Sequence, residues 1–183
     1  MATPQEYVPN LIVTAGFPCS GKSTIANHLE GNNGFVRFSS DEIREAVFRV
    51  GPTDYEDYRQ NDPYFENEEK LVFDCLDILK YKGLFQKKDV VIDITGFFNY
   101  DRDRFFNTNI ELPANKYLLR LNVTPEEITK RNIEKGRTND VYTGWKASWE
   151  EPHGNGYEVL TFDNNTPEDL EFIIASLDER FSR

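Results

Sequence analysis

The chain has 183 residues, 38% of them hydrophobic, and its formal net charge at pH 7 is −11. This length suits one domain with its own core, so we expect residues 1–183 to fold as a single domain. The negative charge argues against a broad contact with duplex nucleic acid, which depends on neutralising many phosphates. A small basic cleft that grips one phosphate or one strand end remains compatible with it.

The sequence shows no signal for a membrane or for export. No apolar run reaches the length of a membrane span, and the polar N-terminus, MATPQEYVPN, does not resemble a signal peptide. Two cysteines, Cys19 and Cys75, do not make a disulfide framework, and no Cys/His cluster has zinc-ligand spacing. We therefore expect a cytoplasmic protein with two reduced thiols, and we find no indication of an obligate protein partner.

Apolar runs and helical periodicities alternate along the chain. In chain order they predict a strand at 11–16, a helix at 22–31 that ends at Gly31, a strand at 34–40, a helix at 40–50, a loop at 51–64, a helix at 66–83 that ends at Gly83, strands at 89–96 and 116–123, a helix at 124–136, a strand at 157–163 and a helix at 165–181. Thr124 and Glu127 predict a capping box, and Thr166 begins a similar one. The alternation predicts an α/β fold, with a five-stranded parallel sheet and helices on both faces.

One short stretch carries a phosphate-binding motif. Residues 16–24 read GFPCSGKST, which matches G-x-x-x-x-G-K-[ST] and lies between a predicted strand and a predicted helix. In such a loop the backbone amides bind anionic oxygens, the glycines permit close approach, the lysine lies near the outer phosphates and the hydroxyl ligates Mg²⁺. We predict that ATP binds along the whole loop, at Gly16, Phe17, Pro18, Cys19, Ser20, Gly21, Lys22, Ser23 and Thr24.

A second candidate follows the second predicted strand, where the sequence reads RFSSDEIR. This turn shares a rim with the phosphate loop, because ligands gather at the carboxyl ends of parallel strands. Asp41 can accept the proton of an attacking hydroxyl, and Arg44, on the same helical face, can grip an anionic acceptor. Taken alone, the pair also fits an ordinary helix start with a solvated arginine. Beside a phosphate loop we favour the catalytic interpretation, and the absence of N-K-x-D argues against a common GTPase.

Four motifs occur in the order seen in the polynucleotide kinase family, namely GFPCSGKST, SSDEIR, VVIDITG and KRNIEKGR. That family is typified by the kinase domain of the bacteriophage enzyme that phosphorylates 5′-hydroxyl ends, and the resemblance covers residues 10–175. It implies a P-loop NTPase fold similar to that of nucleoside monophosphate kinases, with a lid at 124–140. It also implies ATP and Mg²⁺ as cofactors and a hydroxyl group as the acceptor.

The resemblance implies roles for single residues. Asp41 is similar to the general base that activates the acceptor hydroxyl, and Arg44 to the residue that contacts the acceptor phosphate. Lys22 and Ser23 are similar to the residues that hold ATP and Mg²⁺. Arg131 falls in the region that forms a lid over the ATP phosphates.

The third motif departs from the pattern of the resembling family, in which this strand commonly ends in D-x-T-N. Here the last position is Gly96, so an asparagine contact is missing. Asp93 and Thr95 remain as candidate acceptor contacts, and Asp93 is also a candidate for the Mg²⁺ shell. The alternative interpretation of Asp93 is an acid that caps the next turn.

The lid motif departs as well, since the family commonly carries R-N-x-x-R. Arg131 and Asn132 fit, but Lys135 replaces the second arginine and Arg137 follows two residues later. Lysine lacks the planar fork of arginine. We expect Arg131 to contact the ATP phosphates, with Arg137 and Lys135 behind it; the alternative is a charged, exposed helix end.

The leading prediction is an ATP-dependent kinase of the 5′-hydroxyl end of a polynucleotide. Aromatic residues within 51–75 offer surfaces on which bases stack, although ordinary packing is the simpler interpretation. Four arginines are candidates for lining a short cleft, namely Arg37, Arg44, Arg49 and Arg59. Related folds also phosphorylate small hydroxyl compounds such as nucleosides, sugar acids and drugs, so a small-molecule kinase is the main alternative. A toxin-like kinase of a cell-wall sugar nucleotide and a non-catalytic ATP-binding module are the others.

Overall fold

The computed structural model describes residues 6–107, 112–136, 146–154 and 156–182. Within this part of the chain, five strands form one parallel sheet in the order β2-β3-β1-β4-β5. The strands are β1 (Asn10–Gly16), β2 (Val36–Ser39), β3 (Val90–Asp93), β4 (Asn115–Asn122) and β5 (Glu158–Asp163). The predicted α/β fold is confirmed.

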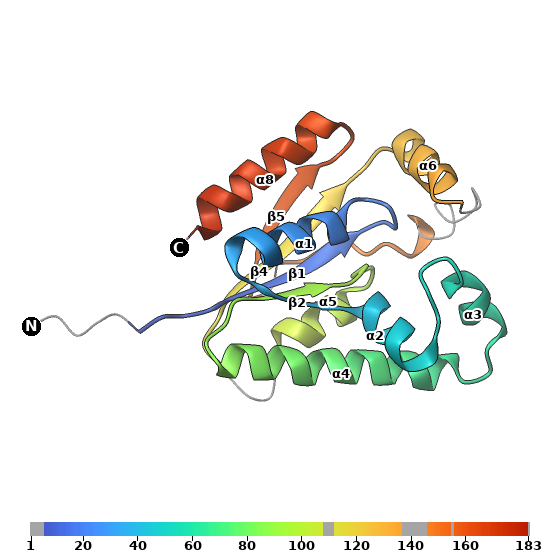
Figure 1. Cartoon of the computed structure of the whole chain (residues 1–183), viewed down its shortest axis with the longest axis horizontal. Helices are drawn as coiled ribbons and strands as arrows, with labels where there is room; N and C mark the ends of the chain where they lie inside the picture. Colours follow the sequence, from blue (N-terminus) through green and yellow to red (C-terminus); the bar gives the residue numbers. More distant parts are fainter. Residues whose placement is uncertain (1–5, 108–111, 137–145, 155, 183) are drawn as a thin grey trace, which may run out of the picture.

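Helices cover both faces of the sheet (Figure 1). They are α1 (Lys22–Asn33), α2 (Ser40–Phe48), α3 (Tyr55–Asn61), α4 (Phe65–Phe85), α5 (Asn99–Phe106), α6 (Pro125–Glu134) and α8 (Pro167–Phe181). The strands run towards the side of the molecule where α2, α3 and α6 lie (Figure 1). This side is therefore the rim at which a ligand of a parallel sheet is expected.

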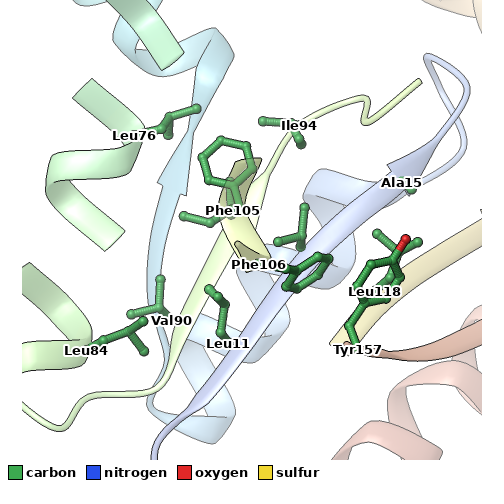
Figure 2. Close-up of a cluster of buried hydrophobic side chains, with 12 residues drawn as sticks. Leu11, Ala15, Leu76, Leu84, Val90, Ile94, Phe105, Phe106, Leu118 and Tyr157 are labelled. Carbon is green, nitrogen blue, oxygen red and sulfur yellow. The ribbon is translucent and has the colours of Figure 1, made fainter. Parts of the chain in front are cut away.

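The sheet separates two hydrophobic clusters, because alternate residues of β1 point to opposite faces. Leu11 and Val13 pack in a cluster with residues of α4 and α5, which Figure 2 shows around Phe105 and Phe106. Ile12 packs in the other cluster, with residues of α1 and α8. The continuous apolar character of this strand follows from burial on both faces.

Helix α3 occupies a segment for which the composition predicts a loop, and that prediction was wrong. Turn-forming residues are frequent there, but Tyr58 is buried and its ring packs edge-on against Phe65, with centroids 5.2 Å apart. The Tyr58 hydroxyl also donates to Glu68 on α4 (2.7 Å). Aromatic packing thus outweighs local propensity, as tertiary context often does.

Two predicted helix ends were also wrong. Helix α1 continues past Gly31 to Asn33. Its C-cap is Gly34, which has a φ of 73° and donates its backbone N–H to the Leu29 carbonyl. Helix α4 continues past Gly83 to Phe85. A Cβ built at Gly83 would lie 2.6 Å from Cγ2 of Val90, so this glycine permits close packing of α4 on β3 rather than a helix end.

The caps of the later helices differ from one another. Thr166 forms the reciprocal capping box with Asp169, as its sequence predicts. At α6 only half of the predicted box is made, because Thr124 accepts from the Glu127 amide while the Glu127 carboxylate pairs with Arg131 (2.9 Å). The Thr124 amide instead donates to Asn165 (2.7 Å). Glu127 therefore positions a lid arginine.

Candidate functional site

The phosphate loop leaves β1 at the centre of the sheet and leads into α1. Gly16 has a φ of 149° and Gly21 a φ of 97°, the left-handed region that favours glycine. A Cβ at Gly16 would lie 2.7 Å from the Leu121 carbonyl oxygen, and one at Gly21 would lie 2.4 Å from Nδ2 of Asn164. Both positions therefore require glycine for two reasons, the backbone conformation of the turn and the close approach of Leu121 and Asn164.

The ammonium group of Lys22 lies inside this loop. Its Nζ donates to the carbonyl oxygens of Gly16 (2.9 Å) and Phe17 (2.7 Å), and the side chain is buried. Next to it, Ser23 and Thr24 are exposed in the first turn of α1. A cation and the amide groups of a helix N-terminus thus lie together, which fits the phosphates of a nucleotide.

Two asparagines and one arginine support the loop from elsewhere in the chain. Asn164, which follows β5, is buried and donates from Nδ2 to the Ser20 carbonyl (2.7 Å). Asn132 on α6 accepts from the Cys19 thiol (3.1 Å), and Nη1 of Arg131 donates to the Cys19 carbonyl (3.4 Å). The lid helix therefore contacts the phosphate loop directly.

The structure describes only some of the predicted lid residues. Arg131 lies against the loop, as described above, whereas Lys135 is exposed at the end of α6. Arg137 and the rest of the lid up to residue 140 lie outside the described residues. Sequence analysis missed Asn164, for which the polar run at the carboxyl end of a predicted strand was the available signal.

The predicted catalytic pair lies on α2, next along the rim. Ser39 caps this helix, and Asp41 is in its first turn with half of its side chain exposed to solvent. Arg44 donates from Nη1 to Oδ1 of Asp41 (2.7 Å) and is 4% exposed. Arg44 is therefore not the solvated arginine of the alternative interpretation. It holds one oxygen of the candidate base Asp41.

Arg44 has a second carboxylate partner that sequence analysis missed. Its Nε and Nη2 donate to the two oxygens of Glu69 on α4, at 2.5 and 3.1 Å, and its guanidinium lies 4.5 Å above the ring of Tyr55. Burial would lower the pKa of Arg44, but the hydrogen bond and charge of Glu69 outweigh it and raise the pKa. Burial also raises the pKa of Tyr55, which stays a neutral phenol.

The end of β3 and the residues just after it lie between the ends of β1 and β2 in the sheet. Oδ2 of Asp93 accepts from Nε (3.2 Å) and Nη2 (2.7 Å) of Arg37, and Arg37 also donates to Glu42 on α2. The Thr95 carbonyl accepts from the Gly16 amide (3.0 Å), which fixes the start of the loop. Asp93 is buried and paired, so its carboxylate is fixed by Arg37 at the end of β3.

Gly96 explains the missing asparagine of the D-x-T-N pattern. Its φ is 56°, and a Cβ there would lie 2.8 Å from the Thr14 carbonyl oxygen. Its own carbonyl accepts from Arg102 (3.0 Å). The close approach of β1 therefore excludes a side chain at this position.

Aromatic residues line the loop on the side of α5. The ring of Phe17 stacks on Trp149, with centroids 5.7 Å apart, and Phe97 meets both rings edge-on. Arg102, which is fully buried, lies 5.1 Å from the Trp149 ring and donates to the Glu150 carbonyl (2.5 Å). The segment after the lid is thereby fixed against the phosphate loop, and neither Trp149 nor Arg102 was singled out from the sequence.

Asp101 has a raised pKa among charged residues of both signs. Asp101, in the first turn of α5, is half-buried, and burial raises its pKa to about 6, with the nearby Glu69 and Glu150 adding to the effect. Arg102 and Arg104 offset part of this rise.

Of the two predicted Mg²⁺ ligands, Ser23 and Asp93, only Ser23 is exposed to solvent. Among the described residues, no group of three His, Cys, Asp or Glu side chains is arranged to hold a metal ion. Asp93 pairs with Arg37, whereas the Ser23 hydroxyl is exposed at the start of α1. This chemistry fits Mg²⁺ that is held by a hydroxyl and by nucleotide phosphates, as Mg²⁺ commonly is.

Residues 11–150 match the model of an AAA-domain family. The chain belongs to this family. An L-seryl-tRNA(Sec) kinase of Methanococcus maripaludis is 27% identical over 149 residues, which cover 78% of this chain and 53% of the relative. The chain thus spans about half the length of the curated relative it matches.

Solved structures resemble this AAA domain over nearly its whole length. A candidate kinase of Chloroflexus aurantiacus J-10-fl superposes with a TM-score of 0.74 at 20% identity, covering 96% of this chain and 97% of that one. A gluconokinase of Sinorhizobium meliloti 1021 superposes with a TM-score of 0.65 at 15% identity, with the same coverage. These likenesses show that the AAA domain has the P-loop kinase fold.

The relative and both solved structures are named as kinases. The relative is named for a serine that is attached to tRNA, the Sinorhizobium meliloti structure is named for gluconate, and the description of the AAA-domain family names no acceptor. Within the ranges that the structure describes, no helix is both long and apolar enough to cross a bilayer.

Proposed function

We propose that this AAA-domain protein transfers the γ-phosphate of ATP to a hydroxyl group of a small, non-anionic acceptor. The observation that carries the proposal is the pairing of Arg44 with Glu69 and Asp41, on the helix that follows β2 at the same edge of the sheet as the phosphate loop. It provides a carboxylate, Asp41, that is exposed on one side and oriented on the other. A general base has to be held within reach of the proton that it abstracts.

The chain supplies four functions in this reaction. The phosphate loop, with Lys22 and the amide groups at the start of α1, binds the triphosphate of ATP. The Ser23 hydroxyl is the side chain that would hold Mg²⁺, which shields phosphate charge when it is bound. Asp41 orients the acceptor hydroxyl and accepts its proton during in-line attack on the γ-phosphorus. Arg131 adds positive charge from the lid, because it already contacts the loop at Cys19.

A 5′-hydroxyl polynucleotide acceptor is the finer prediction made from the sequence, and the contacts of the arginines argue against it. In that assignment Arg44 grips the phosphate next to the 5′ end. Here Arg44 is buried and both edges of its guanidinium face carboxylates. Arg37 pairs with Asp93 and Glu42. A strand end would have to displace Glu69 from Arg44.

The decisive experiment offers labelled γ-ATP with a panel of acceptors. The panel contains 5′-hydroxyl DNA and RNA, seryl-tRNA, nucleosides, sugars and amino sugars. We expect label in a small neutral or cationic hydroxyl compound and none in the oligonucleotides. Label in a 5′-hydroxyl strand, with none in the small compounds, would overturn the choice of acceptor and restore the polynucleotide kinase prediction.

Two variants separate catalysis from nucleotide binding. Asp41→Ala should lower transfer by about 10²- to 10⁴-fold and leave ATP affinity unchanged, because the base acts only on the acceptor. Lys22→Ala should lose both ATP binding and transfer. If wild type binds ATP but labels nothing in the panel and Asp41→Ala behaves identically, the chain is a nucleotide-binding module and the kinase proposal fails.

A further inference from the structure

Helix α4 exposes a row of large apolar residues along its outer side. Leu71, Ile78 and Phe85 are 49%, 67% and 68% exposed. They are spaced seven residues apart, so successive members are offset by only about 20° around the helix. The buried residues of α4, which include Val72 and Leu76, lie on the opposite side.

This row differs from the scattered apolar residues of ordinary surfaces. Single exposed apolar residues are normal, but an amphipathic surface helix carries polar residues opposite its core. In α4, by contrast, an apolar residue lies on the solvent side once in every two turns, at Leu71, Ile78 and Phe85. The ring of Tyr81 stacks on Phe85, with centroids 6.3 Å apart, and widens the row. Apolar residues at heptad spacing are typical of a helix that packs against another helix.

The charges of α4 and the turn after it are divided between its two ends. The N-terminal half is mainly acidic, and its charged residues are Glu66, Glu68, Glu69, Lys70 and Asp74. The C-terminal end is mainly basic, and its charged residues are Asp77, Lys80, Lys82, Lys87 and Lys88. A second copy of the helix that runs antiparallel would bring each acidic half against the basic half of the other copy. The helix dipoles favour the same antiparallel orientation. A parallel copy would oppose like charges.

The spacing of the row is symmetric as well. Ile78 lies midway between Leu71 and Phe85, at seven residues from each. In an antiparallel pair with a two-fold axis at Ile78, Ile78 meets itself and Leu71 of one copy meets Phe85 of the other. Self-complementarity of this kind is the defining feature of a two-fold interface.

From this surface we infer that α4 forms a homodimer interface, with two antiparallel copies of the helix packed through Leu71, Ile78 and Phe85. The partner is a second copy of this chain. Glu69 faces the opposite side of α4, where it pairs with Arg44, so the interface leaves the candidate active site accessible. The inference does not depend on the proposed function.

Sedimentation at several protein concentrations tests the oligomeric state. Wild type should show a concentration-dependent dimer, and Ile78→Asp should weaken self-association by at least about tenfold, because two charges would be buried at the centre of the interface. Phe172→Asp is the matched control, since Phe172 on α8 is 67% exposed and lies outside the row. Circular dichroism confirms that both variants are folded. A monomeric wild type, or an equal loss with Phe172→Asp, would overturn the inference.

Cysteine cross-linking tests the register of the pair. In a background with Cys19→Ser and Cys75→Ser, Ile78→Cys should form a disulfide-linked dimer under mild oxidation. Leu71→Cys alone and Phe85→Cys alone should not, whereas a mixture of the two should. Cross-linking of Leu71→Cys alone, as efficient as that of Ile78→Cys, would contradict the antiparallel arrangement.

Discussion

Glu69 accepts hydrogen bonds from Nε and Nη2 of Arg44, at 2.5 and 3.1 Å, although the two residues lie 25 positions apart in the sequence. The remaining edge of the same guanidinium donates to Asp41. Arg44 therefore links a carboxylate on α4 to the candidate base on α2. We interpret Glu69 as a positioning residue, because it fixes the side chain that orients Asp41.

Removal of Glu69 should therefore impair the chemical step rather than nucleotide binding. In Glu69→Ala, Arg44 loses two of its hydrogen bonds, and the Asp41 carboxylate loses its fixed orientation. We expect kcat to fall by about 10- to 100-fold while the KM for ATP stays unchanged, since small misplacements of catalytic groups have effects of this size. Steady-state kinetics with the acceptor found in the panel measures both constants.

Two further variants show whether the effect comes from position. Glu69→Gln keeps one acceptor oxygen in place and should recover part of kcat. Glu66→Ala removes an exposed acid one turn earlier on the same helix and should leave kcat at the wild-type value. An unchanged kcat in Glu69→Ala would show that Asp41 does not depend on this link.

The glycine after β3 gives a prediction about stability. Gly96→Asn restores the residue expected from the D-x-T-N pattern, and asparagine tolerates a positive φ. Its Cβ would nevertheless lie 2.8 Å from the Thr14 carbonyl oxygen. We expect the free energy of unfolding to fall by about 1–3 kcal/mol in urea titrations, the usual cost of overpacking.

A matched glycine separates the close approach from backbone conformation. Gly34 has a φ of 73°, and a Cβ there meets nothing within 4 Å. Gly34→Asn should therefore change the free energy of unfolding by less than about 0.5 kcal/mol. Equal losses in the two variants would mean that backbone strain, and not the Thr14 carbonyl, decides the residue at position 96.

The central strands β1 and β3 could be predicted because they are buried on both faces and read as continuous apolar runs. The edge strand β2 could be predicted because its apolar and polar residues alternate. The phosphate loop could be predicted because its spacing encodes its conformation. Helix α3 could not, since its stability comes from packing of Tyr58 on Phe65 rather than from its own composition. Gly83 was wrongly predicted to end α4, because the sequence does not show that Val90 approaches the helix at this point.

The candidate site was predicted in its parts but not in its connections. Asp41 and Arg44 are three residues apart, so their contact follows from helical spacing. The pairing of Arg44 with Glu69 joins two separate helices, and no local pattern indicates it. The same holds for Asn164, which reaches the phosphate loop from the far end of the chain. From these distant pairings we propose that Arg44 supports Asp41 rather than contacting the acceptor.

Asn164 gives a prediction about the phosphate loop. Asn164→Ala removes the donor to the Ser20 carbonyl and leaves a buried carbonyl without this partner. The free energy of unfolding should fall by about 1–3 kcal/mol. The KM for ATP should rise about tenfold, because the loop amides lose their fixed orientation.

A surface asparagine provides the control for this loss. Asn115→Ala removes an exposed amide hydrogen bond to Asn10, at the amino end of the sheet. It should leave the KM for ATP unchanged. If Asn164→Ala lowers stability but binds ATP normally, then Asn164 supports the fold and not the nucleotide site.

The raised pKa of Asp101 predicts how stability changes with pH. Burial, aided by Glu69 and Glu150, raises this pKa from its ordinary value of 3.8 to about 6, so the folded state binds the proton more tightly than the unfolded state. The stabilisation from the proton is complete below pH 3.8 and is lost as the pH rises through about 6.

Asp101→Asn removes the charge, so its free energy of unfolding should exceed that of wild type by on the order of 1 kcal/mol at pH 8. This advantage should disappear towards pH 4. Urea titrations at several pH values measure the difference. A difference between Asp101→Asn and wild type that does not vary with pH would contradict a raised pKa at this carboxyl group.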